Sequence, residues 1–452
     1  MRLHSFFIET HGCQMNEHDS EKIGGLLARR GLVPAPSADD ADLFLLNTCS
    51  VREKAVQKVY SRLGELKERK RAKADFLIGV MGCVAQQEGE NILKRAPHVD
   101  LVVGTHLYHA IPDLLDELTQ GAGGGPPAGL VATAFLDDSE PPSAEAVSRS
   151  NSFRAAVTVM EGCNKHCAFC IVPHTRGKER NRRASSVLEE IRQATAEGFV
   201  EVLLLGQTVN SYKDPANPRY RFAELLSDVS EIEGVERLRF TSPHPRHFTD
   251  DVISLIAERD NICPQVHLPL QSGSSRILRR MRRQHDAAWY RALVEKFRNC
   301  GRQIALSTDV IVGCPGETAE DFEKTLDLVR FAEFEQMFSF KYSPRPMTEA
   351  FGWEDDVGES EKSRRLTVLQ GVQRDIQLDL HRRRYLDREF DVLVEGTARD
   401  GMRRFGRTAS NKIVNFFGEE ETGEFARVRI TEIGPNSLVG EPVVHCRLSG
   451  TG

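Results

Sequence analysis

The chain has 452 residues, enough for about three domains of roughly 150 residues each. Hydrophobic residues make up 40 % and charged residues 28 %, so an ordinary globular core can be buried. No apolar run approaches the roughly 20 residues that a membrane span needs. The N-terminal apolar stretch meets a carboxylate at Glu9, too early for a secretory signal. These features predict a cytoplasmic protein with no membrane association.

The net charge of −6 does not by itself indicate a nucleic-acid-binding protein. Net charge averages over domains, however, and binding needs one basic face only. The ten cysteines favour metal or catalytic use over disulfides, because the cytosol keeps thiols reduced.

Residues 1–118 alternate strand and helix signals. Apolar runs typical of strands lie at 4–10, 42–48, 75–82 and 100–104, with helical spacing between them, as at 17–30. This alternation predicts a parallel sheet. Residues 119–150 are rich in Gly, Pro and Ser without periodicity, which predicts a flexible linker.

Residues 151–384 resume the alternation and predict a second α/β domain. Its expected strands are 155–160, 201–205, 237–240, 265–269, 304–312 and 336–342. Six strands favour a partial parallel β/α barrel, because a closed eight-fold barrel needs more chain. A long polar helix is expected at 358–384. The tail, 385–448, has short β-rich runs at 390–394, 412–415, 426–430 and 437–439, typical of a small antiparallel barrel.

Cys13, Cys49 and Cys83 each come directly after one of the first three predicted strands. The carboxyl ends of parallel strands share one sheet edge, where open α/β sheets bind ligands. We therefore expect the three thiols to converge as an incomplete ligand set for an iron–sulfur cluster. Three buried cysteines acting as small hydrophobic residues are the alternative.

Cys163, Cys167 and Cys170 follow the first barrel strand with the spacing C-x3-C-x2-C. A zinc site needs four ligands, whereas three thiolates on a 4Fe–4S cluster leave one iron open. A structural zinc or a loop of unpaired cysteines is the alternative. The remaining cysteines lack ligand spacing and are expected to be structural: Cys263, Cys300, Cys314 and Cys446.

The C-x3-C-x2-C spacing resembles the signature of the radical S-adenosylmethionine (SAM) superfamily. The resemblance implies a 4Fe–4S cluster whose open iron binds SAM, and reductive cleavage of SAM to a 5′-deoxyadenosyl radical. The cofactor carries this chemistry, and the protein supplies placement and shielding. Phe169 matches the aromatic residue that superfamily members place beside the adenine. Two clusters and one radical generator together predict a sulfur-insertion enzyme.

Motifs along nearly the whole chain resemble the methylthiotransferase family, and within it the MiaB-type tRNA enzymes. HGCQMN, LNTCSV and GVMGCVAQ are similar to the N-terminal domain of that family. MEGCNKHCAFCIVPHTRGKE, FTSPHPRHF and DVIVGCPGE are similar to its radical SAM core, and GRTASNKIVNF to its RNA-binding TRAM domain. The resemblance implies a flavodoxin-like domain, a partial (β/α)6 barrel and a small β-barrel.

The resemblance also implies contacts with SAM. Gln207 and Asn210 are expected near its methionine moiety, and Asp309 and Ile311 near its ribose and adenine. Ordinary strand-end polar or core residues are the alternative for these four positions. The sequence departs from the family pattern, with open consequences for these contacts, at Thr208, His174, Asn181, Gln284 and His285.

Residues 381–417 carry nine basic against five acidic side chains. Phe405, Phe416 and Phe417 are interleaved with them and could stack on unpaired bases. RNA contacts are expected from Arg403, Arg404, Arg407 and Lys412, with a solvated charged face as the alternative. A second basic cluster is expected on one helical face, where it could contact phosphates: Arg276, Arg279, Arg280 and Arg283.

HGCQMN favours the MiaB type over siblings that modify threonylcarbamoyl adenosine in tRNA or an aspartate of a ribosomal protein. The implied reaction replaces the hydrogen on carbon 2 of isopentenyl adenosine, beside the tRNA anticodon, with a methylthio group. The second cluster would handle the sulfur, and the base must be unstacked to react. Implied partners are tRNA, a reducing protein such as flavodoxin or ferredoxin, and a sulfur or cluster donor. The rivals are the same chemistry on threonylcarbamoyl adenosine, and a non-catalytic RNA-binding iron–sulfur protein.

Overall fold

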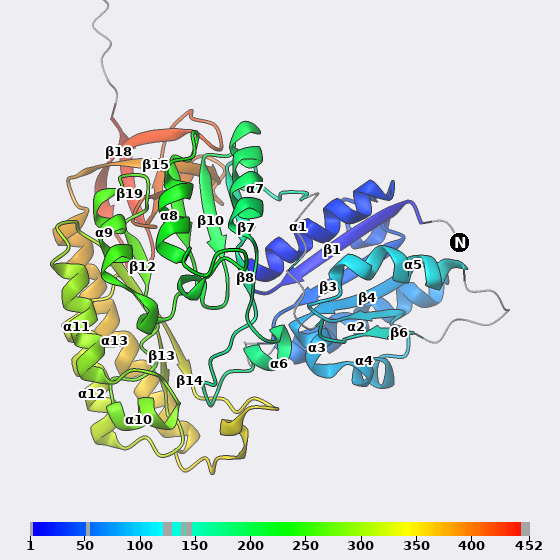
Figure 1. The fold of residues 1–452 in the computed structure, drawn as a ribbon, viewed down its shortest axis with the longest axis horizontal. Coiled ribbons are helices and arrows are strands. Elements are labelled where there is room, and N and C mark those ends of the chain that lie inside the picture. The colour runs from blue at the N-terminus through cyan, green and yellow to red at the C-terminus, as the bar shows by residue number, and fades with distance from the viewer. Residues whose placement is uncertain (1–2, 51–54, 121–128, 137–140, 142–146, 444–452) are drawn as a thin grey trace, which may run out of the picture.

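The structure, a computed structural model, describes residues 3–50, 55–120, 129–136, 141 and 147–443. Figure 1 shows an N-terminal α/β domain beside a curved β/α barrel, and a small β-barrel on the far end of that barrel. Cys446 lies outside the described residues. Among the described helices, none has the length and apolar character needed to cross a bilayer.

The N-terminal domain is a parallel sheet in the order β2-β1-β3-β4-β5-β6. Its strands are β1 (Ser5–His11), β2 (Val33–Pro34), β3 (Leu43–Thr48), β4 (Leu77–Gly82), β5 (Leu101–Val103) and β6 (Leu130–Ala132). The order 2-1-3-4-5 of its first five strands is that of flavodoxin-like folds. The predicted parallel-sheet, flavodoxin-like fold class is therefore confirmed.

Helices cover both faces of this sheet because successive strand residues point to opposite sides. Leu43 and Leu45 pack with helices α1 (Gln14–Arg29) and α5 (Ile111–Gln120). Phe44 and Leu46 pack with α2 (Ala55–Ala72), α3 (Cys83–Glu88) and α4 (Glu90–Arg95).

Strand β6 lies inside the segment expected to be a flexible linker. It pairs in parallel with β5, with Leu130 opposite Leu101 and Ala132 opposite Val103. The apolar Leu-Val-Ala run thereby covers the edge of β5, which gives residues 130–132 a fixed place in the sheet.

The central domain contains all six predicted strands: β7 (Arg154–Thr158), β10 (Glu201–Leu205), β11 (Arg237–Phe240), β12 (Gln265–His267), β13 (Ala305–Val312) and β14 (Gln336–Lys341). They form two three-stranded parallel sheets joined by a bridge between Leu238 and Ile262. The outer helices are α7 (Ala184–Ala196), α8 (Phe222–Ser230), α9 (Asp250–Glu258), α11 (Ala287–Arg298) and α12 (Ala319–Ala332). The predicted partial β/α barrel is confirmed.

Four short elements lie in the loops at the carboxyl end of this barrel: β8 (Met160–Glu161), α6 (Val172–Arg176), β9 (Arg180–Asn181) and α10 (Ser275–Arg280).

The long polar helix forms as α13 (Glu359–Arg384) and leads into the C-terminal barrel. That barrel closes in the order β15-β16-β17-β19-β18. Its strands are β15 (Glu389–Thr397), β16 (Arg404–Thr408), β17 (Ile413–Phe416), β18 (Phe425–Ile433) and β19 (Leu438–Pro442). The pairs are antiparallel except β17 with β19.

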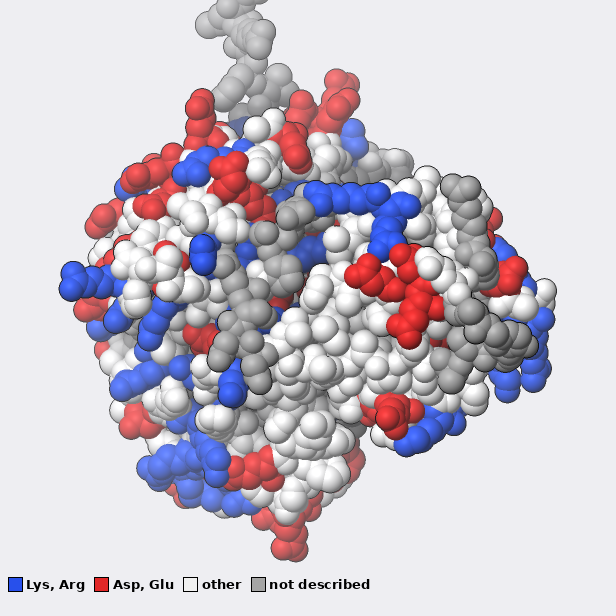
Figure 2. Space-filling view, turned by 45° about the vertical axis from the view of Figure 1, so that its right-hand side comes forward, with Lys and Arg blue, Asp and Glu red and all other residues white. Residues whose placement is uncertain are grey.

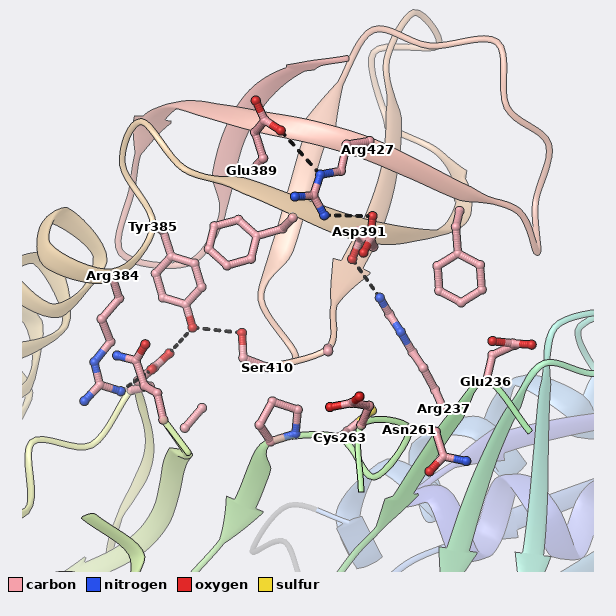
Figure 3. A pocket seen from close by; sticks show the side chains of 18 residues that line it. Glu236, Arg237, Asn261, Cys263, Arg384, Tyr385, Glu389, Asp391, Ser410 and Arg427 are labelled. Carbon is pink, nitrogen blue, oxygen red and sulfur yellow. Dashed lines mark hydrogen bonds and ion pairs between the residues drawn. The ribbon is translucent and has the colours of Figure 1, made fainter. Parts of the chain in front are cut away.

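The C-terminal barrel docks on the amino ends of the central strands. Arg237, the first residue of β11, donates to the backbone oxygens of Arg407 and Asp391 at 2.7 Å each. Figure 3 shows Arg237 pointing toward Asp391, and Tyr385 turned toward Ser410, around a cavity of about 530 Å³. Because this contact lies at the amino ends, the C-terminal barrel does not cover the loops at the carboxyl ends of the strands.

Candidate functional site

Cys13, Cys49 and Cys83 meet at the carboxyl edge of the N-terminal sheet. Cys13 caps α1, Cys49 follows β3, and Cys83 is the first residue of α3. The Cys49 thiol hydrogen-bonds both other sulfurs, and these bonds are the largest cause lowering the pKa of Cys13 to about 7 and of Cys83 to about 6. The same bonds raise the pKa of Cys49. The sheet therefore brings the three predicted thiols together.

Gly82 positions Cys83. Its φ of +93° lies in the left-handed region, where side chains are strained. A Cβ at this position would meet Asn47 Oδ1 and the backbone oxygen of Thr48. Only glycine therefore lets the chain turn from β4 into α3 with Cys83 beside the other two thiols.

Arg176 brings a buried positive charge to these thiols from the central domain. It is the last residue of α6, is 3 % exposed, and donates to Asp19 of α1 at 2.7 Å. Its charge also lowers the pKa of Cys13 and Cys83. The sequence reasoning missed this residue, although it lies six positions after Cys170.

Cys163, Cys167 and Cys170 lie in the loop between β8 and α6. Gly162, at φ +73°, precedes Cys163, and a Cβ there would meet the backbone of Lys178. Burial, followed by the neighbouring Cys167, raises the pKa of Cys170 to about 12. Arg283 Nη1 lies 3.4 Å from Cys167 Sγ, so a cation also borders this second set.

The two cysteine sets are candidate ligands for iron–sulfur clusters. Among the described residues, no three His, Cys, Asp or Glu side chains form a site for one metal ion. A 4Fe–4S cluster binds each thiolate through a different iron, so its ligands need not surround a single ion. Each set offers three sulfurs beside a guanidinium, which suits an anionic thiolate-bound cluster.

Helix α6 links the two cysteine sets. It begins two residues after Cys170 and packs against α3, whose first residue is Cys83. Figure 1 shows α6 lying between the central barrel and α3. Helix α6 therefore connects the loop of the second cysteine set to the domain that carries the first.

Two of the residues expected near SAM pack together. Phe169 and Ile311 lie in one small apolar cluster with Cys314 and Tyr342.

Gln207 has a buried Oε1 without a hydrogen-bond partner in the described part of the chain, as a ligand-binding amide would. Asp309 faces His267, with 3.2 Å between Oδ2 and Nε2.

Asn210 bonds the backbone of His244. Its Oδ1 accepts from the backbone N–H of His244 at 2.8 Å, and its Nδ2 donates to the backbone oxygen of the same residue at 3.0 Å. Both ends of the amide are therefore engaged in fixing the loop after β11.

The expected RNA contacts divide into exposed and buried residues. Arg403 and Arg404 remain partly exposed on the C-terminal barrel, and Arg407 pairs with Glu395 at 3.1 Å. Lys412 is buried and donates to the backbone oxygen of Glu335 at 2.7 Å, so the expectation that it contacts RNA is corrected. On the face in Figure 2, basic and acidic side chains are interspersed without one continuous basic patch.

Two further sequence expectations are corrected. Phe416 is fully buried in the C-terminal barrel, whereas Phe417 is 60 % exposed. The basic cluster does not share one helical face, because α10 ends at Arg280. Arg276 instead pairs with Asp321, and Arg283 turns toward Cys167.

Three families match consecutive parts of the chain. Residues 5–104 match the uncharacterized protein family UPF0004, residues 157–329 the radical SAM superfamily, and residues 383–443 the TRAM domain. Among solved structures, the radical SAM methyltransferase TsrM from Kitasatospora setae gives a TM-score of 0.56 at 14 % identity, covering 77 % of each chain. The cobalamin-dependent radical SAM enzyme OxsB gives 0.52 at 12 % identity, covering 88 % of this chain and 62 % of OxsB. At these identities the likeness concerns the fold.

These matches define a radical SAM enzyme with an attached TRAM domain. Two relatives are named tRNA-2-methylthio-N(6)-dimethylallyladenosine synthase and are 45 % identical to this chain. The one from Koribacter versatilis aligns over 97 % of this chain and 98 % of its own, and the one from Solibacter usitatus over 97 % of both. The chain belongs to the family of tRNA-2-methylthio-N(6)-dimethylallyladenosine synthases, as its motifs predicted.

Proposed function

We propose that the protein attaches a methylthio group to carbon 2 of N6-dimethylallyl (isopentenyl) adenosine beside the anticodon of tRNA. The relatives' name supports this activity. The observation that supports it most is that α6, which begins two residues after Cys170, packs against α3, whose first residue is Cys83. A single radical-generating cluster would need no second thiol set there.

Each cysteine set has a separate role in this proposal. Cys163, Cys167 and Cys170 hold the 4Fe–4S cluster that binds SAM, and a second cluster is held by the other set, Cys13, Cys49 and Cys83. When bound, the first cluster would supply the electron that cleaves SAM, and the second would handle the sulfur that is transferred. Arg176 and Arg283 keep positive charge beside the thiolates, which stabilises their ionised form.

The barrel interior orients SAM and the base. Asp309 pairs in register with Phe338, and Ile311 with Phe340, so all four side chains share one sheet face. Both phenylalanines are about half exposed, at 47 % and 48 %. With Phe169 and Gln207 they offer an apolar wall with a few polar groups, which suits adenine rings and a dimethylallyl substituent.

The partners follow from the same proposal. The TRAM domain supports tRNA binding, with Arg403, Arg404 and Arg407 as its contacts. Cleaving SAM needs an electron, so a reducing protein such as flavodoxin or ferredoxin is a proposed partner. A sulfur or cluster donor is a second proposed partner. The proposed location of the protein is the cytoplasm. The proposed domain boundaries are 1–118, 151–384 and 385–448.

The test uses the full chain reconstituted anaerobically with iron and sulfide, and supplied with SAM and with dithionite as the electron donor. It should convert an anticodon stem-loop carrying N6-dimethylallyl adenosine into its 2-methylthio form, detected by nucleoside mass spectrometry. A matched stem-loop carrying threonylcarbamoyl adenosine should stay unmodified. Product from the second RNA alone would overturn the proposed substrate, and SAM cleavage without either product would overturn the proposed reaction.

A further inference from the structure

A group of polar side chains lies at the carboxyl end of β11, and the roles proposed above use only one of its members, Arg283. We call it the His244 cluster; its members are His244, His247, His285, Lys165, Arg246 and Arg283. The rings of His247 and His285 lie 5.7 and 6.1 Å from that of His244. The cluster borders the cysteine loop, because Lys165 lies between Cys163 and Cys167 and Arg283 contacts Cys167.

His244 presents a buried hydrogen-bond donor. Its Nδ1 accepts from the backbone N–H of Arg246 at 3.2 Å, so the neutral ring carries its proton on Nε2. His244 is 4 % exposed, and Nε2 has no hydrogen-bond partner among the described residues. A buried donor without an acceptor is unfavourable, and an oxygen of a bound ligand would remove this cost.

The charges around this donor are mostly positive. Lys165 comes from the cysteine loop, Lys213 from the loop after β10, Arg246 from the loop after β11 and Arg283 from the loop after α10. Burial and then Arg283 lower the pKa of His244 to about 2, so the ring stays neutral. The facing carboxylate is Asp286, which caps α11 and lies nearest His285.

We propose that the His244 cluster binds a phosphodiester of the substrate RNA, with His244 Nε2–H donating to a phosphate oxygen beside Lys165, Arg246 and Arg283. The inference rests on the proposed function, which makes RNA the substrate. Charge-assisted hydrogen bonds to phosphate are typical of nucleic-acid contacts that set position, not sequence. A phosphate held here would place the neighbouring base at the mouth of the barrel.

The exposure of the cluster favours RNA over the carboxylate of SAM. Arg246 and Lys213 are exposed, so the positive charge continues from the buried donor to the surface. Arg246 also lies 5.2 Å above the ring of the half-buried Trp289. A basic group beside an accessible indole suits a nucleotide chain, which brings both phosphates and bases.

The test is a His244→Asn variant of the reconstituted full chain. The Asn oxygen can still accept from the Arg246 N–H, but the side chain cannot place a donor at the Nε2 position. We expect its affinity for the anticodon stem-loop to fall about 10-fold, which corresponds to about 1.4 kcal/mol. His98→Asn is the matched control, since His98 bonds the Leu63 oxygen within the N-terminal domain. Thermal melting checks that both variants fold.

A neutral-backbone RNA locates the contact. Stem-loops with one methylphosphonate linkage next to the target adenosine should bind the wild type about 10-fold more weakly at one position. At that position the linkage should weaken His244→Asn less than the wild type, because only the contacts of Lys165, Arg246 and Arg283 are left to lose. Equal losses in both proteins at every position, or an unchanged affinity of His244→Asn, would overturn the phosphate contact. A loss of SAM affinity matching the loss of RNA affinity would overturn it in favour of the SAM carboxylate. If the wild type itself neither binds nor modifies the stem-loop, the proposed function fails as well.

Discussion

The guanidinium of Arg176 donates to the carboxylate of Asp19 across 2.7 Å, with both side chains buried. The bond joins α6 of the central domain to α1 of the N-terminal domain. Because α1 begins one residue after Cys13 and α6 begins two residues after Cys170, it fixes one cysteine set relative to the other. Removing one partner leaves an unpaired buried charge, whose cost is far larger than that of a surface pair.

The first prediction tests this pair through stability. Asp19→Asn should lower the free energy of unfolding of the apo-protein by about 3–5 kcal/mol. The control is Asp113→Asn, which removes an exposed carboxylate paired with Arg30 and should cost no more than about 1 kcal/mol. Urea denaturation followed by circular dichroism measures both. Similar small losses in the two variants would show that the interdomain pair is not structurally important.

The second prediction concerns the two cysteine sets. The reconstituted wild type should bind about eight irons, as two 4Fe–4S clusters require. Replacing Cys163, Cys167 and Cys170 by Ala should leave about half the iron and abolish SAM cleavage. Replacing Cys13, Cys49 and Cys83 by Ala should also leave about half, and should stop formation of the methylthio product. Iron analysis with electron paramagnetic resonance decides the outcome, and full iron retention in either variant would contradict the assignment.

The third prediction separates exposed from buried basic residues in the TRAM domain. Arg404→Ala should weaken tRNA binding and reduce its dependence on salt, because a phosphate contact releases a counterion. Lys412→Met should instead lower the stability of the contact between the TRAM domain and the barrel, since its ammonium lies 3.2 Å from Glu335 Oε2. Binding titrations at several salt concentrations and limited proteolysis distinguish the two effects. An equal loss of salt dependence in Lys412→Met would show that this lysine reaches RNA after all.

The fourth prediction concerns acid. Burial opposes ionisation of Glu201, but Arg239 and Arg154 outweigh it and lower its pKa to about 2. A carboxyl whose pKa is lowered by folding stabilises the protein above its unfolded pKa, and this contribution of about 3 kcal/mol is lost as pH falls toward 2. Glu201→Gln should therefore be less stable than the wild type at neutral pH, by a margin that shrinks below about pH 4.5. Denaturation at a series of pH values measures the margin, and a constant difference would contradict the assigned pKa.

Local pattern alone was enough to predict much of this protein. The six barrel strands and the parallel N-terminal sheet follow from apolar spacing, which reports how a segment will bury one face. Helix α13 was expected as one long polar segment. The positions of Cys13, Cys49 and Cys83 after three strands also sufficed to predict their meeting, because parallel strands end at one edge.

The errors arose where the partner of a residue is far away in the sequence. Strand β16 was not predicted, since its Arg-rich sequence lacks a strand pattern and is stabilised by pairing with β15 and β17. Lys412 looks like a surface cation in the sequence, but its ammonium is buried in the domain interface, where it donates to the backbone oxygen of Glu335. Arg176 and the free donor of His244 carry no sequence signal. Their roles depend on which buried groups lie beside them, and only tertiary packing decides whether a charge or donor finds a partner.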